Sequence, residues 1–170
     1  MHRLATVVDP ADTLALRQAL GRLVTGVAIV TASHAGEPVG MTVNSFTPVS
    51  LEPPLVSFCV RTGSGTGRQI LAAGAFAVNV LSERQRFLAE RFTGNPSARF
   101  AGTAYREAIT GAPLLDDALA SFDCRIVAHL TLGDHELIVG EVVTSVVEPG
   151  DRPALAYFLG SYNSVAASSC

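Results

Sequence analysis

The chain has 170 residues, of which 48% are hydrophobic and 16% are charged, and its formal net charge is −3. This length predicts one domain with one hydrophobic core, and a negative charge without a basic block excludes nucleic acid as the main partner. All 12 basic residues are arginines, which excludes a Schiff-base lysine and a phosphate-binding P-loop.

The composition also limits where the protein works and what it binds. The longest apolar runs, such as residues 27–30, are far shorter than the ~20 residues of a membrane span, and the first residues do not form a signal peptide. We therefore expect a cytoplasmic protein without a membrane segment. A mean hydropathy of +0.35 is high for a monomer and favours a homo-oligomer. Cys59, Cys124 and Cys170 are widely spaced, which indicates neither a disulfide framework nor a metal site.

The first third of the chain predicts one helix followed by strands. Residues 12–23 have helical spacing with Asp12 or Thr13 as N-cap, and we interpret them as an amphipathic lid helix. Strands are predicted over residues 27–32, 38–46 and 55–60, the last of them starting after two prolines.

A glycine-rich loop follows the third predicted strand over residues 61–67, before a short helix at 68–73. Glycine N–H groups, two hydroxyls and a guanidinium at a helix start are typical of anion binding, but the same pattern also fits a flexible surface turn. The glycine spacing and the antiparallel strands before it exclude a Rossmann dinucleotide site.

The rest of the chain predicts mostly strands. A strand at 76–81 precedes a polar helix at 83–92 that Ser82 caps, then a loop-rich region with a helical turn at 114–120. Further strands are expected at 121–132, from 135 to 143 across a Gly-Asp turn, and once within 153–162; the tail from 166 is expected to fray. The pattern indicates a mainly β fold, a closed antiparallel barrel with a few capping helices.

Several ordered motifs together give the chain a family resemblance. Residues 40–61 (GMTVNSFTPVSLEPPLVSFCVR), the strand FAVNVL, the Gly133-Asp134-His135 turn ahead of GEV, and the closing YFLGSY resemble the short-chain flavin reductase family. The resemblance covers about residues 14–165, and the chain is treated as a single domain over 1–170. It implies an FMN-binding split barrel, a homodimer, and reduction of free flavin by a nicotinamide cofactor for a partner monooxygenase.

The resemblance also implies which residues bind the cofactors. The strand at 41–46 would run along the flavin ring and its ribityl chain, and the segment at 59–66 would flank the ribityl and phosphate groups; His135 would line the nicotinamide side as the catalytic residue. The polar side chains of the strand offer hydrogen-bond donors and acceptors that fit the flavin ring, although they also suit an ordinary edge strand. The implied cofactor-binding residues are Met41, Thr42, Val43, Asn44, Ser45, Phe46, Cys59, Val60, Arg61, Ser64, Thr66 and Tyr162.

Three functions follow from these observations. The first is an NAD(P)H:flavin oxidoreductase that transfers a hydride from NADH or NADPH to FMN or FAD, a reaction that needs ring stacking but no nucleophile. The second is a non-catalytic flavin-binding protein on the same barrel. The third, a pyridoxamine-phosphate oxidase-like enzyme, would need a basic pocket, and few arginines are placed to build one. The sequence leaves the choice of flavin, nicotinamide and partner oxygenase open.

Overall fold

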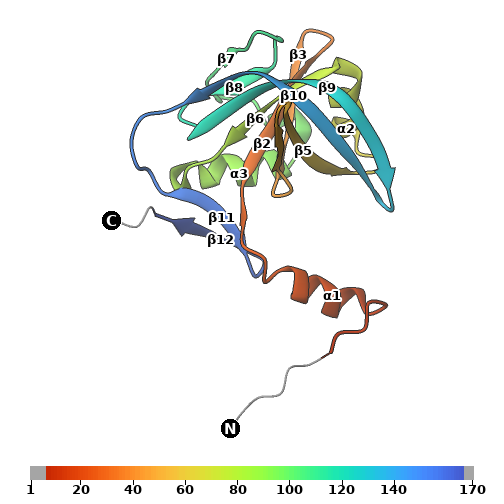
Figure 1. Ribbon diagram of the computed structural model, residues 1–170. Helices are drawn as coiled ribbons and strands as arrows, with labels where there is room; N and C mark the ends of the chain where they lie inside the picture. The colour runs from red at the N-terminus through yellow and green to blue at the C-terminus, as the bar shows by residue number, and fades with distance from the viewer. Residues whose placement is uncertain (1–6, 167–170) are drawn as a thin grey trace.

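A seven-stranded antiparallel sheet forms the body of the protein in the computed structural model, which describes residues 7–166 (Figure 1). Every neighbouring pair in it is antiparallel, so the predicted mainly β, antiparallel fold is confirmed. The hydrogen-bonded strand pairs leave β3 and β4 at the two edges of the sheet, so the pairing does not form the closed barrel that the sequence predicted. In order across the sheet, the strands are β3 (Glu37–Val43), β2 (Ala28–His34), β6 (Ala75–Val80), β9 (Ala120–Leu132), β10 (His135–Val147), β5 (Pro54–Arg61) and β4 (Thr47–Leu51).

Two smaller sheets extend this body. One pairs β7 (Tyr105–Glu107) with β8 (Pro113–Leu115), and the other has the order β1 (Thr25–Gly26), β11 (Ala154–Phe158), β12 (Ser161–Val165).

Two predictions for this part of the chain were wrong. Residues 114 and 115, predicted as the start of a helical turn over 114–120, belong to strand β8. The backbone N–H of Leu115 donates to the buried Oδ1 of Asn79 at 2.8 Å, which stabilises the extended conformation. The single strand predicted within 153–162 is a hairpin of two strands, because Leu159 and Gly160 take positive φ angles of 49° and 79° and reverse the chain.

The helices that cover the sheet begin at capping side chains, although α2 begins at Gly65, three residues before its predicted start at 68. The side chain of Ser64 accepts a hydrogen bond from the Gly67 N–H at the start of α2 (Gly65–Ala73). Ser82 and Gln85 form a capping box at the short 3₁₀ helix η1 (Glu83–Gln85), which leads into α3 (Arg86–Thr93). A second 3₁₀ helix, η2 (Pro96–Ala98), follows α3. Helix α2 packs on β2 and β3, and α3 packs on β3.

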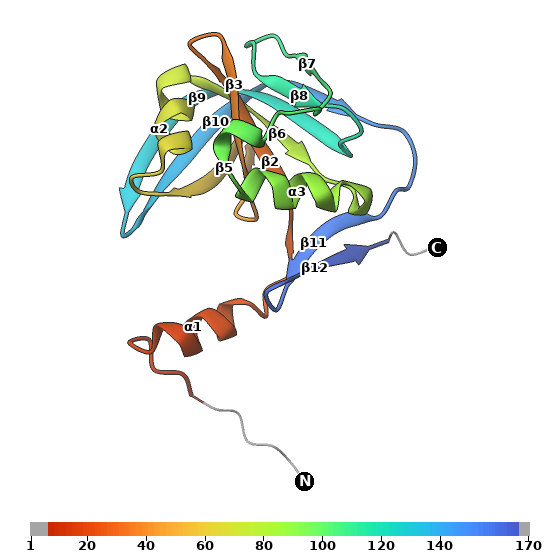
Figure 2. The ribbon, with the colours of Figure 1, turned by 180° about the vertical axis from the view of Figure 1, so that it is seen from behind.

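Helix α1 (Thr13–Leu20) forms as predicted, with Asp12 as its N-cap, but it does not cover the main sheet of its own chain (Figures 1 and 2). Figures 1 and 2 show that it projects away from the main sheet beyond β11 and β12. None of its residues is buried, and Leu14 and Leu20 are largely exposed. The predicted fraying of the tail falls mainly on residues 167–170, which lie outside the described residues.

Two hydrophobic clusters meet at β2, and the first of them includes Val43 of β3. One fills the inside of the main sheet, where the rings of Phe58 and Phe76 pack edge to face at 5.0 Å. The other includes Ile29 of β2, Phe92 of α3 and Leu155 of β11. The end of β3 and the residue after it line a cavity next to the end of α3 and the β11–β12 hairpin.

Candidate functional site

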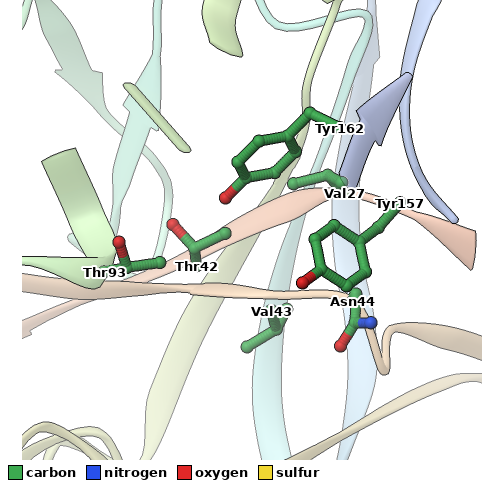
Figure 3. Close-up of a pocket in the computed structure, with 7 residues that line it drawn as sticks. All are labelled: Val27, Thr42, Val43, Asn44, Thr93, Tyr157 and Tyr162. Atoms are coloured by element: carbon green, nitrogen blue, oxygen red, sulfur yellow. The ribbon is translucent and has the colours of Figure 1, made fainter. Parts of the chain in front are cut away.

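A cavity of about 220 Å³ lies between the end of β3, the end of α3 and the β11–β12 hairpin. Figure 3 shows the hydroxyl groups of both tyrosines pointing toward the strand that carries Thr42 and Asn44. No charged side chain lines this cavity, so it suits an uncharged ring with polar edges. Its lining residues are Val27, Thr42, Val43, Asn44, Thr93, Tyr157 and Tyr162.

The polar side chains of this cavity differ in which hydrogen-bond donors and acceptors remain available to a ligand. The Thr42 hydroxyl donates to the Ala89 carbonyl at 2.7 Å, and the Thr93 hydroxyl donates to the Glu90 carbonyl at 2.6 Å. Both hydroxyls therefore offer lone pairs to a ligand. The exposed Asn44 amide makes no hydrogen bond within residues 7–166, so it can both donate and accept.

The two tyrosines form the aromatic wall of the cavity. Their rings meet edge to face at 5.5 Å, and the Arg86 guanidinium lies 5.6 Å from the centre of the Tyr162 ring. Burial raises the pKa of Tyr162, and Tyr157 and Glu90 raise it further while Arg86 lowers it. The Tyr162 hydroxyl is therefore a hydrogen-bond donor at neutral pH.

Strand β3 ends at Val43, three residues before its predicted end at Phe46, and the other predicted residues of the 41–46 stretch have structural contacts. Ser45 donates from its hydroxyl to the Cys59 carbonyl at 3.2 Å and accepts from the Cys59 N–H at 2.9 Å. Met41 and Phe46 pack on the core of the main sheet, with the Phe46 ring 5.8 Å from that of Phe122. These contacts hold the strand in place and leave Asn44 facing the cavity.

The predicted residues at 59–66 lie apart from the cavity that Tyr162 lines. Val60 is buried beneath Gly67, where an added Cβ would come within 2.9 Å of its methyl group. Arg61 is exposed, and Ser64 caps α2. Thr66 is buried and lines two other cavities, of about 440 and 220 Å³, at the start of α2.

His135 lies at the tip of the β9–β10 hairpin, opposite Arg61 of β5 in the strand register. Its Nδ1 is 2.8 Å from the carboxylate of Asp134. The hydrogen bond from His135 and the charge of its ring lower the pKa of this exposed carboxyl. Within one chain, His135 does not line the cavity with Asn44 and Tyr162. Its predicted nicotinamide role stays a prediction.

Three residues that line the cavity were not predicted from the sequence: Val27, Thr93 and Tyr157. The nearly buried Arg99, which joins Thr66 to β3, was not predicted either. The adjacent YFLGSY motif pointed to Tyr157, whereas no sequence signal identifies Arg99. In the part of the chain from 7 to 166, no three His, Cys, Asp or Glu residues are grouped to bind a metal ion.

Comparisons with known proteins assign this architecture. The family model described as flavin reductase like domain matches residues 20–166. The chain belongs to the flavin reductase like family. The family resemblance stated from the motifs is confirmed, and the recognised region spans both the candidate cavity and the glycine-rich loop.

Related members of the flavin reductase like family cover nearly all of the chain. It is 36% identical over 163 residues to the flavin-dependent monooxygenase reductase subunit HsaB of Mycobacterium tuberculosis, covering 95% of this chain and 86% of that protein. It is 41% identical over 159 residues to a probable flavin reductase of Rhizobium meliloti, covering 93% of this chain but only 50% of that protein's length. The solved NADH:FAD oxidoreductase SgcE6 of Streptomyces globisporus has a TM-score of 0.88 at 36% identity, covering 95% of this chain and 98% of that chain.

Proposed function

We propose that this flavin reductase like protein is an NAD(P)H-dependent flavin reductase that supplies reduced flavin to a partner monooxygenase. The observation that carries the proposal is the uncharged cavity between β3 and the β11–β12 hairpin in a chain of this family. The similar HsaB is a monooxygenase reductase subunit, and the similar SgcE6 is an NADH:FAD oxidoreductase.

The residues of the cavity fit a flavin ring. The ring needs donors and acceptors along one edge and flat apolar contact on its faces, and the Asn44 amide, the Thr42 lone pairs and the two tyrosine rings supply them. When bound, a flavin supplies the hydride acceptor, and the protein supplies orientation. The Tyr162 hydroxyl remains protonated and can donate a hydrogen bond at the same edge.

The test is NADH- and NADPH-dependent loss of flavin absorbance under anaerobic conditions, run with FMN and with FAD. We expect turnover with at least one pair, reduced in His135→Ala with flavin binding retained. Tight flavin binding without turnover by either nicotinamide would refute the reductase and favour the non-catalytic flavin-binding protein.

We further propose that the sheet closes as a split barrel between β3 and β5 within one domain, about residues 14–165. Ser45, two residues beyond β3, bonds both backbone groups of Cys59 in β5, which supports closure across the gap that the strand pairing leaves. The free thiols of Cys59 and Cys124 fit our proposal of a reducing cytoplasm. In residues 7–166, no helix has the length and apolar character needed to cross a membrane.

We also propose a homodimer in which a second copy covers α1. An isolated helix of eight residues is unstable in water, and this one leaves the side chains of Leu14 and Leu20 64% and 66% exposed. The adjacent Leu23 is 70% exposed and extends the same apolar surface. Light scattering on a size-exclusion column is expected to give a dimer for the wild type and a monomer for Leu14→Glu/Leu20→Glu. A wild-type monomer would refute this proposal.

A further inference from the structure

Arg86 of α3 lies over the ring of Tyr162, which forms part of the wall of the candidate cavity. The centre of the guanidinium is 5.6 Å from the centre of the ring, a distance at which an aromatic face attracts a cation. The Nε of Arg86 donates to the Glu90 carboxylate at 2.8 Å, one turn further along the same helix. This ion pair is exposed, so it adds little to stability, but it restricts the orientations that the arginine side chain can take.

The Tyr162 ring depends on side chains of other elements for its orientation. Strand β12 pairs only with β11, and the residues on both sides of Tyr162 are exposed. The ring packs on the hydrophobic cluster that includes Phe92 and Leu155, and it meets the Tyr157 ring edge to face at 5.5 Å. Arg86 supplies the contact from α3, and it is the charged one.

A second contact joins β12 to the same helical segment. The Ser164 hydroxyl donates to the Glu83 carboxylate. Tyr162 and Ser164 are two residues apart and share one face of β12, while Glu83 and Arg86 are three residues apart, about one turn, where η1 leads into α3. The two contacts therefore align β12 with the start of α3 and keep Arg86 over the Tyr162 ring.

The guanidinium reaches the ring from outside the candidate cavity. Tyr162 lines both the candidate cavity and a neighbouring cavity of about 330 Å³, whereas Arg86 lines only the second. Arg86 can therefore act on a ligand of the candidate cavity through Tyr162 and not by direct contact.

We propose that Arg86 is a positioning residue of the reductase site, which holds the Tyr162 ring so that its hydroxyl stays directed at the strand that carries Thr42 and Asn44 (Figure 3). The proposal rests on the proposed flavin reductase function and adds to it a residue outside the cavity. Arg86 also acts on the hydroxyl by its charge, because it opposes the rise in the pKa of Tyr162 that burial, Tyr157 and Glu90 cause.

The first experiment is a double-mutant cycle on kcat/KM for flavin, with Arg86→Gln, Tyr162→Phe and the variant that combines them. Loss of the contact between cation and ring should lower kcat/KM about two- to fivefold in Arg86→Gln, and Arg86→Lys should recover part of it, because an ammonium also binds an aromatic face. Since Arg86 acts through the Tyr162 hydroxyl, Arg86→Gln should have no further effect in the Tyr162→Phe background. The matched control is Arg84→Gln, which removes an exposed arginine that makes no recorded bond in the described chain and should leave kcat/KM unchanged.

The second experiment needs no turnover and follows the ionisation of Tyr162 in the free protein. The sequence has three tyrosines and no tryptophan, so the ultraviolet absorbance of ionised tyrosine can be titrated directly, and the Tyr162 step is the one missing in Tyr162→Phe. The pKa of Tyr162 should rise in Arg86→Gln, because a positive charge that favours the ionised phenol is lost, and should rise less in Arg84→Gln. The charged and titratable groups around this phenol are Arg86, Glu90 and Tyr157, with Glu83 and Arg84 in the neighbouring cavity.

Three results would overturn the proposal. An unmoved pKa of Tyr162 in Arg86→Gln would show that the guanidinium does not lie against this ring. Equal losses of kcat/KM for Arg86→Gln in the wild-type and Tyr162→Phe backgrounds would show that Arg86 acts independently of the hydroxyl, and an equal loss in Arg84→Gln would reduce the effect to net charge. If the wild type reduces no flavin, the proposed reductase function fails by itself, and the titration still decides whether Arg86 holds Tyr162.

Discussion

Ser45→Ala tests whether the end of β3 is tied to β5. The substitution removes the hydrogen bond to the Cys59 carbonyl and the hydrogen bond from the Cys59 N–H, at 3.2 and 2.9 Å. Each contributes about 1 kcal/mol net, and a half-buried N–H left without a partner costs about 1 kcal/mol more. The expected loss in the free energy of unfolding is therefore about 2–3 kcal/mol. For a chain of this size, that corresponds to a fall in Tm of about 5–10 °C.

The measurement is urea unfolding followed by circular dichroism, together with the Kd for FMN. Ser33→Ala is the matched control, because Ser33 is an exposed strand serine whose hydroxyl has no recorded bond in the described residues. The control should stay within about 0.5 kcal/mol of wild type. Ser45→Ala should also weaken flavin binding, because Asn44 is positioned by the same segment. A Ser45→Ala protein as stable as the control would refute the proposed closure of the barrel.

Three further predictions concern single side chains. Tyr162→Phe should lower NADH-dependent turnover about tenfold or less while leaving Tm nearly unchanged, because only the hydroxyl of a half-buried ring is removed; turnover equal to wild type would exclude a role for that hydroxyl. His135→Ala should raise the pKa of Asp134 toward its ordinary value in an NMR titration. The stabilising contact in the wild type is present at neutral pH and is lost as pH falls through the lowered pKa of Asp134, and an unmoved pKa would contradict the pairing. Cys124, whose pKa burial and Asp123 raise to about 12, should resist iodoacetamide at pH 8 until the protein unfolds, and rapid labelling of the folded protein would contradict its burial.

Local signals in the sequence were sufficient for the helices and hairpins. Asp12, Ser64 and Ser82 cap the three helical segments that the spacing predicts, and the Gly133-Asp134 turn connects the two longest strands. Each of these features depends on residues within a few positions of one another, so the sequence alone can specify it.

Elements that depend on distant partners were not predicted. Strand β4 was missed for a local reason, since it is largely exposed and contains Pro48 and so has no alternating pattern, although its partner β5 begins three residues after it ends. Strand β8 was mistaken for a helical turn because its stabilising partner, Asn79, is 36 residues away in sequence. The bonds of Arg99 to Gly40 and Thr66 were missed for the same reason, since these partners are 59 and 33 residues away in sequence.

Side-chain bonds hold the stretch around the end of β3 at three points before any ligand binds. Arg99 bonds the carbonyl of Gly40, Thr42 bonds the carbonyl of Ala89 in α3, and Ser45 bonds β5. Asn44 lies between the last two points and keeps its amide free. A segment fixed in this way loses little conformational entropy on binding, so flavin affinity depends on direct contacts more than on ordering of the strand. Loss of any one point should therefore weaken the binding of every flavin alike, because each point holds the same segment of backbone.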